Sequence, residues 1–299
     1  MLRNDYPLHM SSGRSISQVA DDLGLPIATI RSWERRYGFP EPDRTDGKHR
    51  RYSAEQIEAL RVVRDEITRG HRAAEAVAIA RSAGPRAVRN DALDRFAEAA
   101  DRLDAEGIRD ALVEAAEVVG LDRAIVEVAL PGIRRIGDRW KAGLCDVGNE
   151  HVATHTVQQW LAGLQTFAPP PYRPGPLLLA CAPTELHSIG IEAFGVILAR
   201  RGWSCRMLGP MTPVSSLVAA ARTSRAAGVI VTAQRSVGRR SAIDALVAVS
   251  TMRDVGVFYG GNAFTTERAR AEVPGTYLGT DLLAAAETVA AALDRPPAG

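Results

Sequence analysis

The chain has 299 residues, enough for two or three ordinary domains with sizeable cores. Hydrophobic residues make up 46% and charged residues 24%, a balance that excludes a chain disordered throughout. No apolar run approaches the roughly 18 residues of a membrane span, and the first residues lack the apolar stretch of a secretory signal. The three cysteines lie far apart, which favours neither a disulfide framework nor a cysteine zinc site. We therefore expect a cytoplasmic protein with no membrane partner.

Charge is distributed unevenly along the chain. Lys and Arg exceed Asp and Glu by 4 in residues 1–89, fall short of them by 6 in residues 90–170, and exceed them by 4 in residues 171–299. This asymmetry predicts segments with separate functions, and the basic first segment suits an anionic partner.

Residues 1–14 are predicted to be a disordered leader, and residues 15–85 a first domain. The pattern predicts short helices and a basic hairpin in this domain, with helices over 17–23, 27–37, 53–69 and 72–82 and the hairpin over 40–52. Two short helices joined by a Gly-containing turn and followed by a basic hairpin are the layout of a winged helix-turn-helix. Gly84-Pro85 is expected to end the last helix, with a linker after it.

The helix over 27–37 is too polar for a core helix. Ile27, Ile30 and Trp33 form its apolar stripe, whereas Arg31 and Arg35 share another face, from which they can reach bases or phosphates. The hairpin adds basic donors at a short exposed turn. The candidate DNA-binding residues are Thr29, Arg31, Arg35, Arg36, Tyr37, Arg44, Lys48, His49, Arg50, Arg51 and Tyr52. A solvated charged surface is the alternative explanation of the same composition.

Residues 90–168 carry helical periodicity almost throughout. Short breaks near Gly107, Gly120, Pro131-Gly132 and 143–148 predict a bundle of four helices. The proline-rich residues 169–176 are predicted to be a stiff linker.

Residues 177–296 alternate apolar strands with amphipathic helices. The predicted strands cover 177–182, 203–208, 228–232, 255–259 and 276–278, and the predicted helices cover 190–201, 214–225, 239–252, 263–272 and 281–293. This alternation indicates a doubly wound α/β domain, Rossmann-like, with a five-stranded parallel sheet. Ligands of such a domain lie at the carboxyl ends of the strands. The whole chain is thus predicted to be multi-domain: winged helix-turn-helix, four-helix bundle, then α/β domain.

The loop after the first strand of that domain contains the strongest candidate ligand. His187 can present an imidazole there, and Glu185 can hydrogen-bond the other ring nitrogen, which fixes the tautomer. Glu185→Gln is expected to weaken ligand binding less than His187→Ala, because glutamine keeps an acceptor. Gly190 opens the next helix and allows a large group to approach the backbone. A purely structural loop histidine is the alternative.

Other candidate ligands lie in the helical segment. His151 and His155 are four apart, a spacing that zinc can use, but no third ligand is evident and zinc is not expected. No nucleophile paired with a base is visible, so an enzyme is not expected.

Residues in the first domain also match a known family. Thr29–Gly38, then Pro42, Arg44-Thr45 and Arg50–Ser53, resemble the MerR family of transcriptional regulators over about residues 14–82. The resemblance implies a winged helix domain that binds double-stranded DNA as a dimer. Members usually continue into one long dimerisation helix, which Gly84-Pro85 is expected to cut short here.

The segment Glu185–Gly190 resembles the Asp-x-His-x-x-Gly signature of cobalamin-binding domains, with Glu in place of Asp, and the match covers about residues 174–296. The resemblance implies that His187 is the lower axial ligand of cobalt. Two further pairs fit the signature: Ser215 and Leu217 its Ser-x-Leu, which lines the pocket for the nucleotide tail, and Gly260 and Gly261 its glycine pair.

Trp140, followed ten residues later by Glu150-His151, is similar to the cap of the light-sensing, adenosylcobalamin-dependent MerR repressors of the CarH type. The resemblance covers nearly the full chain. It implies that Trp140 packs over the upper face of adenosylcobalamin and that Glu150 and His151 hold the adenosyl group. The cofactor then acts as a switch, with light, of a dimer or tetramer that binds an operator. From the residues alone, Trp140 fits an ordinary bundle core equally well.

One position departs from the CarH pattern. A histidine follows the cap Trp in that class and takes the upper cobalt site after illumination, whereas Lys141 stands here. A hydrated ammonium must lose its proton before it binds a metal, so no stable adduct is expected. Two alternatives remain: a regulator of the same build that senses another small molecule, and a corrinoid carrier for methyl transfer.

Overall fold

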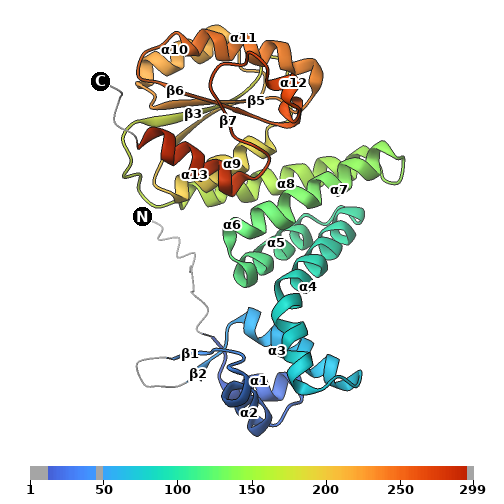
Figure 1. Cartoon of the computed structure of the whole chain (residues 1–299). Coiled ribbons are helices and arrows are strands. Elements are labelled where there is room, and N and C mark those ends of the chain that lie inside the picture. The colour runs from blue at the N-terminus through green and yellow to red at the C-terminus, as the bar shows by residue number, and fades with distance from the viewer. Residues whose placement is uncertain (1–12, 45–49, 295–299) are drawn as a thin grey trace, which may run out of the picture. The chain divides into compact units, whose positions relative to one another are not determined.

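The structure is a computed structural model that describes residues 13–44 and 50–294. The chain forms two compact units: the first extends to Gly132 without residues 103–105, and the second consists of those residues and the chain from Ile133 onward. Figure 1 shows the elements of each unit. No helix of the described residues is long and apolar enough to cross a membrane.

The first unit begins with the predicted winged helix-turn-helix. Its elements are α1 (Ile16–Leu23), α2 (Ile27–Tyr37), strands β1 (Asp43–Arg44) and β2 (Arg50–Arg51), which pair antiparallel, and α3 (Ala54–Thr68). Ser15 and Ser53 each close a capping box with a glutamine three residues on, which satisfies backbone donors at the start of α1 and α3. Val19, Ile30 and Leu60 are fully buried and join these helices in one core.

The end of the predicted leader is part of this domain. Arg14 forms an antiparallel bridge with Tyr52, with both N···O distances 2.9 Å. A Cβ at Gly13 would lie 2.8 Å from the carbonyl oxygen of Tyr52, so the close approach requires glycine. The prediction of disorder is therefore wrong at Gly13 and Arg14, because Arg14 pairs with Tyr52 at the edge of the hairpin and Gly13 packs against it. Residues 1–12 lie outside the described residues.

The predicted helix end at Gly84-Pro85 is wrong. Helix α4 (Ala73–Asp101) runs through it for 29 residues. A proline inside a helix removes one donor, and the helix-forming residues on both sides outweigh that local cost. The expectation that a long helix is cut short after the winged helix therefore fails as well.

The rest of the helical segment consists of α5 (Ala105–Val119), α6 (Leu121–Ala124), the π-helical turn η1 (Ile125–Ala129), α7 (Leu130–Lys141) and α8 (Val147–Thr166). The predicted break at Pro131-Gly132 is absent, since α6, η1 and α7 follow one another without interruption. The wide turn η1 lies just before Pro131, where the ordinary helical donor is missing. Four helical stretches are present as predicted, and their packing as one bundle stays a prediction.

The second unit contains the predicted five-stranded sheet. The strands are β3 (Pro176–Cys181), β4 (Ser204–Gly209), β5 (Gly228–Thr232), β6 (Gly256–Gly260) and β7 (Thr276–Tyr277), all parallel in the order β4-β3-β5-β6-β7. The helices are α9 (Ile189–Arg200), α10 (Val214–Ser224), α11 (Arg239–Ser250), α12 (Glu267–Arg270) and α13 (Leu282–Leu293). The prediction is confirmed throughout, except that the helix expected over 263–272 is reduced to the 3-10 turn η3 (Asn262–Phe264) and α12.

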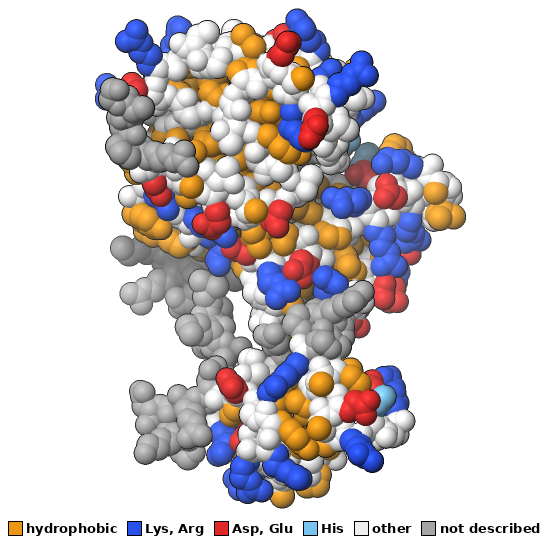
Figure 2. Space-filling view, in the orientation of Figure 1, with side chains coloured by type: hydrophobic (Ala, Val, Ile, Leu, Met, Phe, Trp, Pro, Cys, Tyr) orange, Lys and Arg blue, Asp and Glu red, His pale blue; other side chains and the backbone are white. Residues whose placement is uncertain are grey.

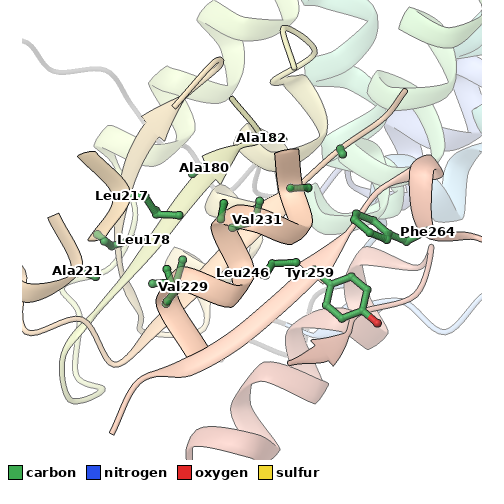
Figure 3. Packing of buried hydrophobic residues seen from close by; sticks show 14 of the residues in the cluster. Leu178, Ala180, Ala182, Leu217, Ala221, Val229, Val231, Leu246, Tyr259 and Phe264 are labelled. Atoms are coloured by element: carbon green, nitrogen blue, oxygen red, sulfur yellow. The ribbon is translucent and has the colours of Figure 1, made fainter. Parts of the chain in front are cut away.

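Both faces of the sheet are covered, which explains the unbroken apolar strands. Helices α10 and α11 lie on one face and α9 and α13 on the other (Figure 1). On the first face, Leu178 and Val229 of the central strands pack with Leu217 of α10 and Leu246 of α11 (Figure 3). This rigid core holds the loops at the carboxyl ends of the strands.

Candidate functional site

The strand order places a topological switch point between β3 and β5, because β4 lies on the outer side of β3 and β6 on the outer side of β5. Loops after two such strands diverge and leave a crevice in which open α/β sheets bind ligands. The loop after β3 contains Glu185 and His187, and the loop after β5 contains Gln234 and Arg235.

Glu185 connects these two loops through both of its carboxylate oxygens. Its Oε1 lies 2.5 Å from His187 Nδ1 and accepts from the backbone N–H of His187 at 2.9 Å. Its Oε2 accepts from the backbone N–H groups of Gln234 at 2.7 Å and Arg235 at 3.0 Å. The residue is 1% exposed. Although its side chain is one methylene longer than that of Asp, the carboxylate keeps the bond to the imidazole and also reaches the neighbouring loop.

Burial by itself favours the neutral carboxyl group, but the hydrogen bonds from His187, Arg235 and Gln234 outweigh it and hold the pKa of Glu185 below its ordinary value. An ionised carboxylate only accepts, so the proton in its bond with His187 belongs to Nδ1. In the neutral imidazole the lone pair is then on Nε2, and the His187 side chain is 63% exposed. The site therefore presents one tautomer of an outward-facing imidazole.

A third loop joins the same edge of the sheet. The backbone N–H of Met211, after β4, donates to the carbonyl oxygen of Glu185 at 2.9 Å. Each of the three loops exposes one large apolar side chain: Leu186 after β3, Met211 after β4 and Val237 after β5. Exposed apolar side chains on the same three loops as the imidazole suit a large, partly apolar ligand.

The predicted glycine pair has two different roles. Gly261 has φ +101°, and a Cβ there would lie 2.3 Å from the carbonyl oxygen of Ala233, so no other residue fits. Gly260 ends β6, and the nearest atoms to a Cβ there are 4.0 Å away. Gly190 lies in the first turn of α9, where a Cβ would make an ordinary contact with Gln234 at 3.6 Å.

Ser215 and Leu217 are not part of this arrangement. Ser215 is exposed in the first turn of α10, and Leu217 is buried in the core between α10 and the sheet. The residues beside Glu185 and Gly261 are instead Thr232, Ala233 and Gln234 at the end of β5. The assignment of Leu217 to a ligand pocket is therefore wrong, because its side chain packs into the core. The end of β5 was not identified from the sequence as part of the site. The general rule that ligands lie at the switch point of a doubly wound sheet points to this strand end.

The cap residues lie on α7 and α8 of the second unit. Trp140 is 46% exposed near the end of α7, so it does not belong to a helix-bundle core. Glu150 accepts from Thr154 Oγ1 at 2.7 Å and lies 3.8 Å from His151 Nε2. Gln158 of α8 donates to Glu192 of α9 at 3.1 Å, which ties the cap helix to the sheet domain.

In the described part of the chain, no three His, Cys, Asp or Glu residues are grouped so that they could hold a metal ion. His155 lies 2.9 Å from the side-chain amide of Gln159, so its ring has a partner within its own helix.

On the winged helix domain, Arg31, Arg35 and Arg36 of α2 are exposed, while Thr29, Tyr37 and Arg51 are half-buried. Lys and Arg side chains gather at the end of this domain that α2 forms (Figure 2). Arg44 lies in β1, and Lys48 and His49 lie outside the described residues. The exposed arginines of α2 remain the candidate contacts to DNA.

Two of the predicted DNA-binding residues have partners inside the domain. Tyr52 is 0% exposed, and its hydroxyl donates to Glu34. Its assignment as a DNA contact is wrong, since the bridge to Arg14 and the apolar core enclose the ring. Arg50 Nε donates to the other oxygen of Glu34 at 2.8 Å.

Family models match the chain in three consecutive segments. The model of the MerR HTH family regulatory protein matches residues 14–82, and two B12 binding domain models match residues 92–165 and 175–288. Together with the fold, these matches define the class: a DNA-binding transcriptional regulator with cobalamin-binding domains.

The similar curated proteins include two repressors of Myxococcus xanthus. The HTH-type transcriptional repressor CarA is 34% identical over 207 residues, which cover 68% of this chain and 70% of CarA. The HTH-type transcriptional repressor CarH is 28% identical over 219 residues, 68% of this chain and 72% of CarH. The chain belongs to the family of the CarA and CarH repressors.

A solved structure shares the fold of about two thirds of the chain. The monomethylamine corrinoid protein of Methanosarcina barkeri superposes with a TM-score of 0.51 at 17% identity and covers 69% of this chain and 99% of its own. At this identity the likeness concerns the fold alone.

Proposed function

We propose that the chain is a repressor that binds its operator as an oligomer, dimer or tetramer, and whose oligomeric state is switched by adenosylcobalamin and light. The names of its relatives CarA and CarH, both repressors, support repression over activation. A change in oligomer changes the number of winged helix domains that engage one operator, and therefore the avidity for DNA.

The single observation that carries the cofactor assignment is the Glu185–His187 pair. The carboxylate fixes the proton on Nδ1 and leaves Nε2 exposed at the switch point of the sheet. An imidazole with one nitrogen held by a carboxylate is the usual form of a metal-ligating histidine. His187 is thus proposed as the lower axial ligand of cobalt.

The surrounding residues fit a large ring system with a tail. Leu186, Met211 and Val237 are exposed on the loops after β3, β4 and β5, and a Cβ at Gly260 would make only ordinary contacts. Gly190, Gly260 and Gly261 are proposed to border the cofactor, and Thr232 and Gln234 replace Ser215 and Leu217 as the proposed lining of the tail pocket.

The half-exposed indole of Trp140 is the proposed lid that would cover a bound cofactor, and Glu150 and His151 are the residues proposed to hold its adenosyl group. When bound, adenosylcobalamin supplies a cobalt–carbon bond that light can break. Lys141 lies 3.3 Å from Asp138 and its side chain is 71% exposed. A solvated, ion-paired ammonium does not ligate a metal, so illumination is proposed to leave no stable bond between cobalt and this side chain.

The test is an absorption spectrum of protein purified in the dark with adenosylcobalamin, followed by size exclusion and operator binding before and after green light. We expect retention of cobalamin in the wild type and its loss in His187→Ala, while His71→Ala in the winged helix domain serves as a matched control. A wild type that binds DNA but retains no cobalamin would instead be a regulator of another small molecule. Retention of cobalamin without DNA binding would indicate a methyl carrier.

A further inference from the structure

Glu34 is a carboxylate on the DNA-reading helix α2, but it does not face outward with the arginines beside it. Its side chain is only 12% exposed and points to the hairpin, where Oε2 accepts from Arg50 Nε at 2.8 Å and Oε1 accepts from the Tyr52 hydroxyl. One carboxylate therefore joins the reading helix to the second strand of the wing.

The partners of Glu34 are fixed as well. Tyr52 is fully buried, and burial followed by the bond to Glu34 raises the pKa of its phenol far above the ordinary value of 10, so it stays a donor. The Arg50 side chain is 34% exposed, and its charge is offset by the carboxylate 2.8 Å away. Arg50 therefore carries a paired charge on the face proposed to bind DNA.

We propose that Glu34 is a specificity-determining residue for DNA: it holds the wing at a fixed distance from α2 and neutralises Arg50. Phosphate contacts raise affinity for every sequence equally, whereas discrimination depends on the placement of the base-reading side chains. By neutralising Arg50 the carboxylate lowers the affinity for every sequence, and by bonding Arg50 and Tyr52 it fixes the wing against α2, the placement on which discrimination depends. The inference rests on the DNA-binding function and deepens it.

Glu34→Gln separates the two roles of the carboxylate. The amide oxygen can still accept from Arg50 Nε while the amide nitrogen donates to the Tyr52 hydroxyl oxygen, so the contacts are kept and only the negative charge is lost. Arg50 is then a cation without a compensating carboxylate, able to contact a phosphate. One added phosphate contact makes the slope of log K against log salt steeper by about one.

The experiment is fluorescence anisotropy with the full-length protein, at several salt concentrations, on two duplexes: one recovered by in vitro selection with the wild type and one of random sequence. For Glu34→Gln we expect tighter binding to both duplexes, a slope steeper by about one and an unchanged preference. Glu34→Ala also removes the contacts to Arg50 and Tyr52, and we expect it to lower the preference for the selected duplex by about fivefold to tenfold; an unchanged preference in Glu34→Ala would overturn the inference. Arg50→Gln alone should leave the wild-type slope unchanged, and the double variant should return to it.

The inference is overturned if Glu34→Gln weakens both duplexes equally at an unchanged slope, because that result describes a merely structural residue. It is also overturned if Arg50→Gln flattens the wild-type slope, because Arg50 would then already contact a phosphate. A wild type that binds no duplex would overturn the DNA-binding function itself, and thermal melting curves of the full chain report independently that the winged helix domain of each variant is folded.

Discussion

Glu185→Gln is a substitution whose consequence depends on atoms that the sequence does not reveal. Glutamine has one accepting oxygen and one donating nitrogen where Glu185 has two accepting oxygens, and all four of its partners are donors. With the amide oxygen toward the backbone N–H groups of Gln234 and Arg235, the amide nitrogen faces His187. The imidazole then accepts at Nδ1 and carries its proton on Nε2, where no lone pair remains for a metal.

The stability cost follows from the same contacts. The backbone N–H of His187 loses its acceptor at a site that is 1% exposed, and a buried donor without a partner costs roughly 1–3 kcal/mol. Two other bonds change from charge-assisted to neutral, so the total is about 2–4 kcal/mol. For a unit of this size the loss corresponds to a melting temperature lower by roughly 5–15 °C.

Scanning calorimetry of the full chain without cofactor measures this shift, and titration with hydroxocobalamin measures the loss of imidazole ligation. Glu192→Gln is the matched control, since among the described residues Gln158 donates to one oxygen of Glu192 and a glutamine accepts equally well. Glu185→Asp keeps the charge and should retain ligation. If Glu185→Gln melts within about 1 °C of the wild type and shows the wild-type cobalamin spectrum, the hydrogen-bond argument is wrong.

Four further results are expected. His187→Ala should lower cobalamin affinity by about tenfold or more, measured by equilibrium dialysis, because the axial imidazole is gone. Gly261→Ala should destabilise the second unit by about 3 kcal/mol or more in chemical denaturation, since a Cβ would meet the Ala233 carbonyl at 2.3 Å, whereas Gly260→Ala should be nearly neutral. Lys141→His should convert a weak or reversible response to green light into a stable one, seen as cobalamin that survives denaturing mass measurement. The winged helix domain should lose stability above pH 10. The pKa of the Tyr52 phenol is higher in the folded than in the unfolded chain, so above pH 10 the unfolded chain loses this proton first and is favoured. Tyr52→Phe should remove that pH dependence in alkaline melting curves.

Local sequence determined the elements of this protein well. The apolar runs that became β3, β5 and β6 predicted a parallel sheet, because only strands buried on both faces lack polar alternation. Ser15 and Ser53 predicted helix starts through contacts that span three residues. The Glu185–His187 contact was predictable for the same reason, since its partners are two residues apart.

Tertiary structure decided everything that joins distant parts of the chain. The second oxygen of Glu185 accepts from a loop about 50 residues away. The side chain of Tyr52 is held by a bond to Glu34 of α2, and its backbone by a bridge to Arg14. Residues 215–217 match the Ser-x-Leu pattern in sequence, but Leu217 packs into the core. The residue that lies beside Gly261 is instead Ala233, at the end of β5. Composition and periodicity show which residues of each segment are buried and which are exposed to water. The strand order decides which loops share one edge of the sheet, and that order is fixed only when the core packs.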